Sequence, residues 1–329
     1  MKKFATIGRG FIVDAFIDSA VSTGIWQLDA VYSRNRADGE SYAAKYGAPK
    51  VYTDLAALAA DADIDGVYVA SPNALHTSQC RLLLEAGKHV LCEKPLAARA
   101  DEVKALQQLA EQKRVVYLEA MMYMHTPLRT ALRQAVDKCG QIFTARLDFS
   151  KRSAHFDAYL RGDTPNIFNP AMETGALMDL GIYTVYPAID LFGMPTDVLA
   201  NASFLRTGAD GAGVALLTYP DKQITLSYAK TARGVLGSEI VGENGTVTLG
   251  ATISQLNDMY IYLRDSEPKA IADNESRLQL MAHEAESWYR FIKNPLDAAY
   301  ADCNRLALQV ATVMEEIRRK ASICFPTDK

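Results

Sequence analysis

The sequence contains few cysteines, and none is placed for a disulfide framework or a zinc site. Five cysteines are scattered over 329 residues, and no two have the Cys-x-x-Cys spacing. An odd and scattered set of thiols is typical of proteins from a reducing compartment. We therefore predict a cytoplasmic protein without a bound metal ion.

An excess of charge of one sign is also missing. The chain has 35 basic and 39 acidic residues, a formal charge of −4, whereas a nucleic-acid-binding surface needs a basic face or stripe. There is no uncharged apolar run long enough to span a bilayer. Arg9 and Asp14 interrupt the segment in which a signal peptide would need its apolar region. We expect neither a nucleic-acid nor a membrane partner.

The composition, with 49% hydrophobic and 22% charged residues, is that of a globular protein long enough for two domains. In the first third, short apolar segments alternate with segments of helical spacing. Because alternating strands and helices form a parallel sheet covered by helices, we predict an α/β domain there. The expected strands cover residues 4–7, 28–32, 66–70, 89–92 and 115–118, and the expected helices 54–61, 76–86 and 101–112.

From Ile142 onward, strand-like segments follow one another and are joined by turn signals such as Pro220-Asp221. Strands in direct succession favour a mostly antiparallel sheet. We place the domain boundary near Tyr123 to Pro127. The expected strands cover residues 142–149, 198–205, 214–219, 224–228, 239–241, 246–249 and 260–263, and helices are expected at 275–293 and 302–320.

A glycine-rich turn follows the first expected strand, in the segment G-R-G-F-I-V at residues 8–13. Gly8 permits a tight turn, and Gly10 lets a pyrophosphate approach the backbone N–H groups at the start of a helix that includes Phe11 and Ile12. Val13 stands where a third glycine or alanine is usual. Such a turn also occurs without any nucleotide, so the motif alone is weak.

The end of the second expected strand favours NADP(H) over NAD(H). An NAD enzyme places an acidic residue about 20 residues beyond the glycines, but here Ser33 and Arg34 occupy that offset, and Asp29 comes too early. A hydroxyl followed by a guanidinium suits a 2′-phosphate. The alternatives are a solvated surface arginine and an enzyme that uses NAD(H).

Two further stretches carry a family resemblance. One reads A-S-P-N-A-L-H at residues 70–76 and G-K-H-V-L-C-E-K-P at 87–95, and the other reads E-T-G-A-L-M-D-L-G-I-Y at 173–183. With the glycines, they resemble the glucose–fructose oxidoreductase/inositol dehydrogenase (Gfo/Idh/MocA) family over essentially the whole chain. The last stretch looks like the branch of dimeric dihydrodiol dehydrogenases and NADP-dependent D-xylose dehydrogenases, which has tyrosine where inositol dehydrogenases have histidine.

The resemblance implies a doubly wound Rossmann domain at residues 1–122. It implies a substrate-binding and dimerisation domain at 123–329, of α+β type, with an open, predominantly antiparallel sheet. Lys94, Asp179 and Tyr183 would then be catalytic and lie around the nicotinamide ring. Departures from the family pattern are Met124, where arginine is common, and Glu173-Thr174, which replace two glycines. The positions that match the family's cofactor lining are Ser71, Pro72, Asn73, His76, Glu93 and Lys94.

The chemistry of these residues fits proton transfer. Tyr183 can exchange a proton with a substrate oxygen only if its pKa, about 10 in model peptides, is lowered, and the Lys94 ammonium would lower it. Asp179 comes four residues before Tyr183 and would share its helix face; we expect it to orient Lys94 or bind a substrate hydroxyl. Plainer roles are open for each: Tyr183 as a core aromatic, Asp179 as a structural hydrogen-bond acceptor and His76 as a packed cap.

A polar loop at residues 151–166 precedes the second motif, and loops on a rigid scaffold often hold substrate. A solvated loop is the alternative. The candidates for substrate contacts there are Lys151, Arg152, His155, Tyr159 and Asn166.

We therefore predict an NADP(H)-preferring oxidoreductase. It would transfer a hydride between the nicotinamide and a secondary alcohol or carbonyl of a sugar, polyol or cyclic diol. The alternative is a non-catalytic NAD(P)-binding regulator, because one fold can serve several functions. A broad sheet with an apolar face also favours a homodimer.

Overall fold

The computed structural model describes residues 1–328, which form two compact units. The first unit contains Met1–His125 and Ser276–Leu308, and the second contains Thr126–Glu275 and the chain from Gln309 onward. The sequence led us to expect a single boundary between residues 122 and 123. The units differ from this expectation because helix α9 (Arg277–Lys293) returns to the first unit. There Trp288 of α9 stacks on Trp26 with ring centroids 4.3 Å apart, and Trp26 Nε1 donates to the Ala285 carbonyl at 2.9 Å.

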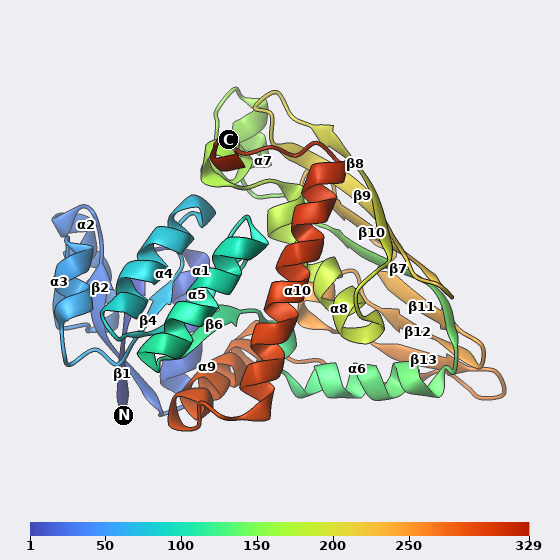
Figure 1. Ribbon diagram of the computed structural model, residues 1–329, viewed down its shortest axis with the longest axis horizontal. Coiled ribbons are helices and arrows are strands. Elements are labelled where there is room, and N and C mark those ends of the chain that lie inside the picture. The colour runs from blue at the N-terminus through green and yellow to red at the C-terminus, as the bar shows by residue number, and fades with distance from the viewer. Residues whose placement is uncertain (329) are drawn as a thin grey trace. The chain divides into compact units, whose positions relative to one another are not determined.

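The first unit is built on a six-stranded sheet in which every strand pair is parallel (Figure 1). The strand order is β3-β2-β1-β4-β5-β6, so the direction of winding reverses between β1 and β4. In such sheets ligands bind beyond the carboxyl ends of the strands at this reversal. The strands are β1 (Lys2–Ile7), β2 (Trp26–Tyr32), β3 (Lys50–Tyr52), β4 (Gly66–Val69), β5 (His89–Glu93) and β6 (Tyr117–Ala120).

Helices connect these strands, and the predicted α/β class is confirmed. The central strand β4 is buried along its whole length. Its Tyr68 stacks on Phe16 of α1 with ring centroids 4.0 Å apart. All five expected strands and all three expected helices are present, with ends that differ by at most a few residues. The helices are α1 (Phe11–Ser22), α2 (Arg36–Tyr46), α3 (Leu55–Ala60), α4 (His76–Glu85) and α5 (Ala100–Lys113).

The second unit is built on an eight-stranded sheet in the order β14-β13-β12-β11-β7-β10-β9-β8. Figure 1 shows these strands side by side from β8 to β13. All pairs are antiparallel except β7 with β10, so the expected predominantly antiparallel sheet is confirmed. The strands are β7 (Ile142–Ser150), β8 (Asp197–Phe204), β9 (Asp210–Thr218), β10 (Gln223–Ala229), β11 (Ser238–Gly242), β12 (Gly245–Leu249), β13 (Tyr260–Leu263) and β14 (Lys269–Ala270).

One face of this sheet is covered and the other is open. Helices α6 (Pro127–Lys138) and α8 (Ile182–Phe192) lie against the covered face (Figure 1). Strand β10 shows the division, because Ile224, Leu226 and Tyr228 are buried while the residues between them are not. Within the described part of this unit, no helix lies on the other face. The long helix α10 (Ala298–Lys320) supplies residues to both units, and the short helix α7 (Phe156–Leu160) stands in the loop after β7.

Among residues 1–328, no helix is both long and apolar enough to cross a membrane.

Candidate functional site

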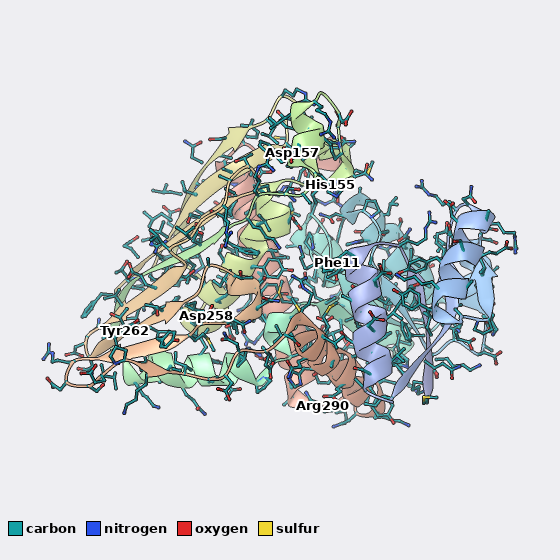
Figure 2. The ribbon with its side chains drawn as sticks, turned by 180° about the vertical axis from the view of Figure 1, so that it is seen from behind. Phe11, His155, Asp157, Asp258, Tyr262 and Arg290 are labelled. Carbon is teal, nitrogen blue, oxygen red and sulfur yellow. The ribbon has the colours of Figure 1, made fainter. Side chains whose placement is uncertain are left out.

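The turn between β1 and α1 has the geometry of a phosphate-binding loop. A Cβ on Gly8 would lie 2.4 Å from the Ala70 carbonyl oxygen, so only glycine fits beside β4. Gly10 has a positive φ of 151° with open space beside it, and no side chain caps the helix that follows. Phe11 is 72% exposed at the start of α1, where Figure 2 labels it, and the Arg277 guanidinium lies 5.4 Å from its ring. The first-turn N–H groups of α1, which include that of Ile12, have no intrahelical partner, so this helix end fits a pyrophosphate.

Ser33 and Arg34 follow β2 at the same edge of the sheet. Arg34 is exposed, and no hydrogen bond or ion pair joins it to another of residues 1–328. The Ser33 hydroxyl is buried without a hydrogen-bond partner in the described chain. Asp29, by contrast, is buried inside β2 and pairs with Lys3 at 3.1 Å and Lys50 at 3.3 Å, which gives it a structural role. The open guanidinium of Arg34 therefore fits a 2′-phosphate.

Two neighbouring strand ends are joined by His76, at the start of α4. The imidazole is fully buried, with Nδ1 2.9 Å from the Pro95 carbonyl oxygen and Nε2 2.8 Å from the Ser71 carbonyl oxygen. Burial lowers the pKa of His76, and a neutral ring donates to only one of these carbonyls. His76 thus links the loop after β4 to the loop after β5. The other residues of the first loop are Ser71, whose hydroxyl donates to Gln79 at 2.7 Å, Pro72, and Asn73 at the start of a 3₁₀ turn.

Lys94 stands directly after β5 on a backbone that is held on both sides. Tyr68 donates its hydroxyl to Glu93 at 2.5 Å, and the Leu96 N–H donates to Glu119 of β6 at 3.2 Å. Residues 95–98 are buried, whereas Glu93 and Lys94 are half-buried. The sequence directs the lysine outward because the apolar residues that follow it fill the core.

In the second unit, Asp179 and Tyr183 share one face of a helix. From Glu173 to Ile189 every residue is buried except these two. Asp179 lies in a π-helical turn, Leu177–Gly181, that continues directly into α8, and π-turns often occur at functional sites. The Tyr183 ring packs edge-to-face on Phe149 of β7, with centroids 5.5 Å apart. Between Glu173 and Ile189, the chain therefore presents only one carboxyl and one phenol outside the core.

Two residues that the sequence did not single out hold this helix. Asp210, buried at the start of β9, accepts a hydrogen bond from the Leu177 N–H at 2.7 Å. Lys230, which follows β10, forms an ion pair with Asp179 at 2.5 Å. Asp179 was expected to orient Lys94 or bind substrate, and Lys230 is its partner within its own unit. The only local sequence signal for Lys230 is a cation directly after a strand, the same signal that Lys94 gives.

The polar loop after β7 is more ordered by internal contacts than its sequence indicates. Arg206 of the β8–β9 turn lies 3.9 Å from the Tyr159 ring, and the Arg206 N–H donates to the Tyr159 hydroxyl at 2.9 Å. Arg152 pairs with Asp157 at 2.6 Å, and Figure 2 labels Asp157 beside His155. Lys151, His155 and Asn166 are exposed. Two of the five candidates, Arg152 and Tyr159, are thus engaged in holding the loop.

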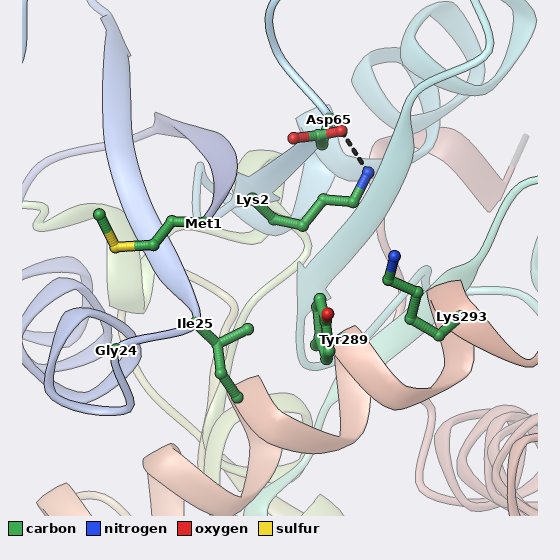
Figure 3. Close-up of a pocket in the computed structure, with 7 residues that line it drawn as sticks. All are labelled: Met1, Lys2, Gly24, Ile25, Asp65, Tyr289 and Lys293. Atoms are coloured by element: carbon green, nitrogen blue, oxygen red, sulfur yellow. Dashed lines mark hydrogen bonds and ion pairs between the residues drawn. The ribbon is translucent and has the colours of Figure 1, made fainter.

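A hollow of about 500 Å³ lies elsewhere in the first unit (Figure 3). The Lys2 ammonium in it pairs with Asp65 at 2.5 Å, as the dashed line marks. Residues 2, 26 and 66 begin β1, β2 and β4, so the hollow lies at the amino ends of the strands. Ligands of doubly wound sheets bind at the carboxyl ends, which excludes this hollow as the cofactor site. Its lining residues are Met1, Lys2, Gly24, Ile25, Asp65, Tyr289 and Lys293.

Comparisons with known proteins agree with this geometry. Residues 2–121 match the model of an oxidoreductase family with an NAD-binding Rossmann fold, and residues 130–248 match the GFO/IDH/MocA C-terminal domain. The chain is 37% identical to scyllo-inositol 2-dehydrogenase (NADP(+)) of Bacillus subtilis, over 100% of both chains. It is 33% identical to D-xylose 1-dehydrogenase (NADP(+)) 2 of Haloferax volcanii, over 66% of this chain and 65% of that one.

A third relative represents the other enzyme of the expected branch. The chain is 26% identical to the trans-1,2-dihydrobenzene-1,2-diol dehydrogenase of Mus musculus, over 99% of both chains. The two matched models together cover most of the chain, and the Bacillus relative covers all of it. The chain therefore belongs to the Gfo/Idh/MocA family of oxidoreductases, whose N-terminal domain is an NAD-binding Rossmann fold.

Proposed function

We propose that this oxidoreductase uses NADP(H) to interconvert a secondary alcohol of a cyclic polyol or sugar and the corresponding carbonyl compound. The observation that carries the proposal is the exposure pattern of residues 173–189, of which only Asp179 and Tyr183 are not buried. The full-length similarity to an NADP-dependent inositol dehydrogenase supports the substrate class. In an inositol and in D-xylose, the carbon numbered in these relatives' names has a neighbouring carbon that carries a hydroxyl.

The catalytic roles follow from the chemistry of three side chains. When bound, the nicotinamide supplies or accepts the hydride, which leaves the protein one proton to move. Tyr183 exchanges that proton with the substrate oxygen, and the Lys94 ammonium stabilises negative charge on the same oxygen as it develops. Asp179 accepts a hydrogen bond from a neighbouring substrate hydroxyl. All three groups serve both directions of the reaction.

The cofactor would be held along the carboxyl ends of β1, β2, β4 and β5. Gly8, Gly10 and the first turn of α1, with Phe11 and Ile12, suit the pyrophosphate. Arg34, with Ser33, suits the 2′-phosphate. The loop at Ser71, Pro72 and Asn73, the strand end at Glu93 and Lys94, and His76 as the link between them would line the remainder. From the polar loop, Lys151, His155 and Asn166 stay candidates for substrate contacts.

Nicotinamide absorbance during turnover tests this function. The purified chain is offered NADP⁺ or NAD⁺ with inositols, aldoses and trans-diols, and the reverse reaction is followed with NADPH and the corresponding ketones. We expect turnover with NADP⁺ and at least one cyclic polyol or aldose. Tight NADPH binding without turnover on any of these compounds would contradict the proposal and favour a non-catalytic regulator.

Replacing Arg34 by alanine tests the cofactor preference. A hydrogen-bonded ion pair to a phosphate contributes about 1.5–3 kcal/mol, so Arg34→Ala is expected to raise the Kd for NADPH by about 10- to 100-fold and to leave that for NADH almost unchanged. Arg36→Ala is the matched control, because Arg36 already pairs with Glu40 at 3.3 Å. Fluorescence titration measures both constants. An equal loss of affinity for the two cofactors would remove Arg34 from the 2′-phosphate site.

We further propose that the open face of the eight-stranded sheet joins two copies of the chain. Its central row reads Leu199, Leu216, Thr225, Arg146, Glu239, Thr248 and Tyr260 across seven strands. Large apolar groups are exposed there, including Val214 and Tyr262, which Figure 2 labels on β13. Broad apolar patches on a protein surface mark interaction sites, and two-fold dimers are the commonest assembly.

A charge placed on this face tests the dimer. In Val214→Arg the new guanidinium would have to be buried without a partner in the interface, which costs several kcal/mol, so we expect the variant to be a monomer at concentrations where the wild type is a dimer. Leu296→Arg is the control, since Leu296 is exposed in the α9–α10 loop. Light scattering gives the masses. A wild-type monomer, or a Val214→Arg dimer, would contradict the proposal.

We also infer a cytoplasmic location. All five cysteines are free thiols, and four of them are buried. Thiols kept unpaired in this way suit a reducing compartment. Fractionation of cells that produce the protein would reveal any other location.

A further inference from the structure

Lys230 is a buried cation at the meeting point of three segments of the second unit. Its side chain is only 2% exposed. Its ammonium pairs with Asp179 of the π-helical turn and lies 5.6 Å from the ring of Phe168, in the 3₁₀ turn that ends the polar loop. Its backbone N–H donates to the Gly211 carbonyl at 2.8 Å, which fixes it to β9. Lysine is almost never buried to this extent unless it is paired.

Asp210, at the start of β9, is a second acidic residue near Lys230. Its buried carboxyl interacts electrostatically with Lys230 and accepts the Leu177 N–H at the start of the same helix. A Cβ on Gly175 would lie 1.8 Å from Asp210 Oδ1, so the chain leaves room for this carboxyl and no more. Lys230 thus stands near two carboxyls, one at the beginning of the helix and one within it.

The two carboxyls differ in what surrounds them. Asp210 is fully buried, whereas the Asp179 side chain is 29% exposed. Titratable groups of this unit near the π-helical turn include Tyr228 of β10 and Tyr183 of α8, while β7 presents Phe149. Among Lys230, Asp210, Tyr228 and Tyr183, Lys230 is the cation, so of these four it is the group that favours ionised Asp179.

If the Lys230–Asp179 ion pair served only to stabilise the fold, its burial would contribute little to the free energy of unfolding. Desolvation of a buried ion pair often cancels its Coulomb attraction, and well-packed apolar residues are then equally stable. The pair here is asymmetric, since the cation is buried and the carboxyl reaches the surface of the helix beside Tyr183. Such an asymmetry suits a carboxylate that must stay charged and fixed in direction.

We propose that Lys230 is a positioning residue that holds Asp179 ionised and in one orientation, as the acceptor for a substrate hydroxyl next to the reacting carbon. Through Phe168, the same ammonium links that acceptor to the 3₁₀ turn at the end of the polar loop. The inference rests on the substrate-binding role of Asp179 proposed above. According to this inference, Lys230 gives the enzyme its preference for substrates with a neighbouring hydroxyl over analogues that lack this hydroxyl.

The pH dependence of kcat/KM tests the proposal. Loss of a neighbouring cation raises a carboxyl pKa, by about 1–3 units for a close pair, so Asp179 would become protonated at higher pH. In Lys230→Met the acidic limb of the kcat/KM profile should therefore move to higher pH by at least about one unit. Preference for the substrate over its deoxy analogue should fall by about tenfold or more. Lys230→Arg keeps the charge and should leave the acidic limb in place.

NADPH affinity and melting temperature show whether each variant is folded. If Lys230→Met does not fold, Lys230→Arg carries the test, because a longer, forked cation misdirects Asp179. The preference for the substrate over its deoxy analogue should then fall, while the acidic limb of the kcat/KM profile stays at the wild-type pH. An undiminished preference in Lys230→Arg would overturn the inference. An acidic limb that does not move in folded Lys230→Met would also overturn it.

Asp179→Asn separates this inference from the function on which it rests. If the Asp179→Asn variant keeps wild-type turnover and wild-type discrimination against the deoxy analogue, the substrate-binding role of Asp179 itself is refuted. Loss of discrimination in Asp179→Asn, with none in folded Lys230→Met, would refute the role of Lys230 alone.

Discussion

Lys94→Ala is expected to lower kcat by about 10³-fold, and Tyr183→Phe by a similar factor. Removal of one donor to a developing oxyanion costs about 10²–10³ in rate, and loss of a positioned acid or base costs about 10²–10⁴. Because the proposed mechanism has both side chains act on one substrate oxygen, their losses should not add. The double variant should therefore be slower than either single variant by less than tenfold.

Both substitutions leave the local structure in place, so the effects should fall on the chemical step. Hydrogen bonds at Glu93, Pro95 and Leu96 hold the chain on both sides of Lys94. Tyr183→Phe retains the edge-to-face contact with Phe149. Single-turnover absorbance measures the step, and NADPH titration serves as the control for folding. Undiminished turnover in either variant would refute the catalytic assignment of that residue.

The fold was predictable where the pattern of apolar residues is local and strong. Continuous apolar runs such as β4 stand out in the sequence, and so do amphipathic helices such as α5, which is long enough to repeat its period. Strand β3 has only three residues, all half-buried, and α2 has no continuous apolar stripe. Both were missed for that reason. The return of α9 to the first unit depends on Trp26 and Trp288 meeting across more than 250 residues, which no local pattern records.

The candidate site was predictable only where a motif places a side chain at a strand end or on a helix face. Lys94 and Tyr183 stand in such motifs. Lys230 is 51 residues from Asp179, and only the pairing of β9 with β10 and the packing of the helix on that hairpin bring it there. For His76 the sequence indicated a polar residue near the cofactor, while its burial between two carbonyls gives it a structural link. Tertiary partners decide the role of a polar residue, and spacing does not encode them.

Glu284→Gln is expected to stabilise the protein by an amount that grows as the pH rises from 5 to 8, by up to about 1.4 kcal/mol per pH unit. Glu284 of α9 is 1% exposed, and neither of its carboxyl oxygens has a hydrogen-bond partner within residues 1–328. Burial raises the pKa of Glu284 well above its usual range, and the nearby Glu93 and Glu119 raise it further. In the folded protein this carboxyl therefore holds its proton to a higher pH than in the unfolded chain.

The sign of the pH dependence follows from the proton balance. Above a pH of about 4.3 the unfolded chain releases this proton and the folded chain retains it, so folding takes up a proton and the free energy of unfolding falls with rising pH. Glutamine has nearly the same shape and carries no titrating group, so its advantage should grow steadily from pH 5 to pH 8. Glu286→Gln, on the exposed face of the same helix, is the matched control and should show no such trend. Urea unfolding at several pH values measures the difference, and an advantage of Glu284→Gln that is constant with pH would show that the buried carboxyl does not hold its proton.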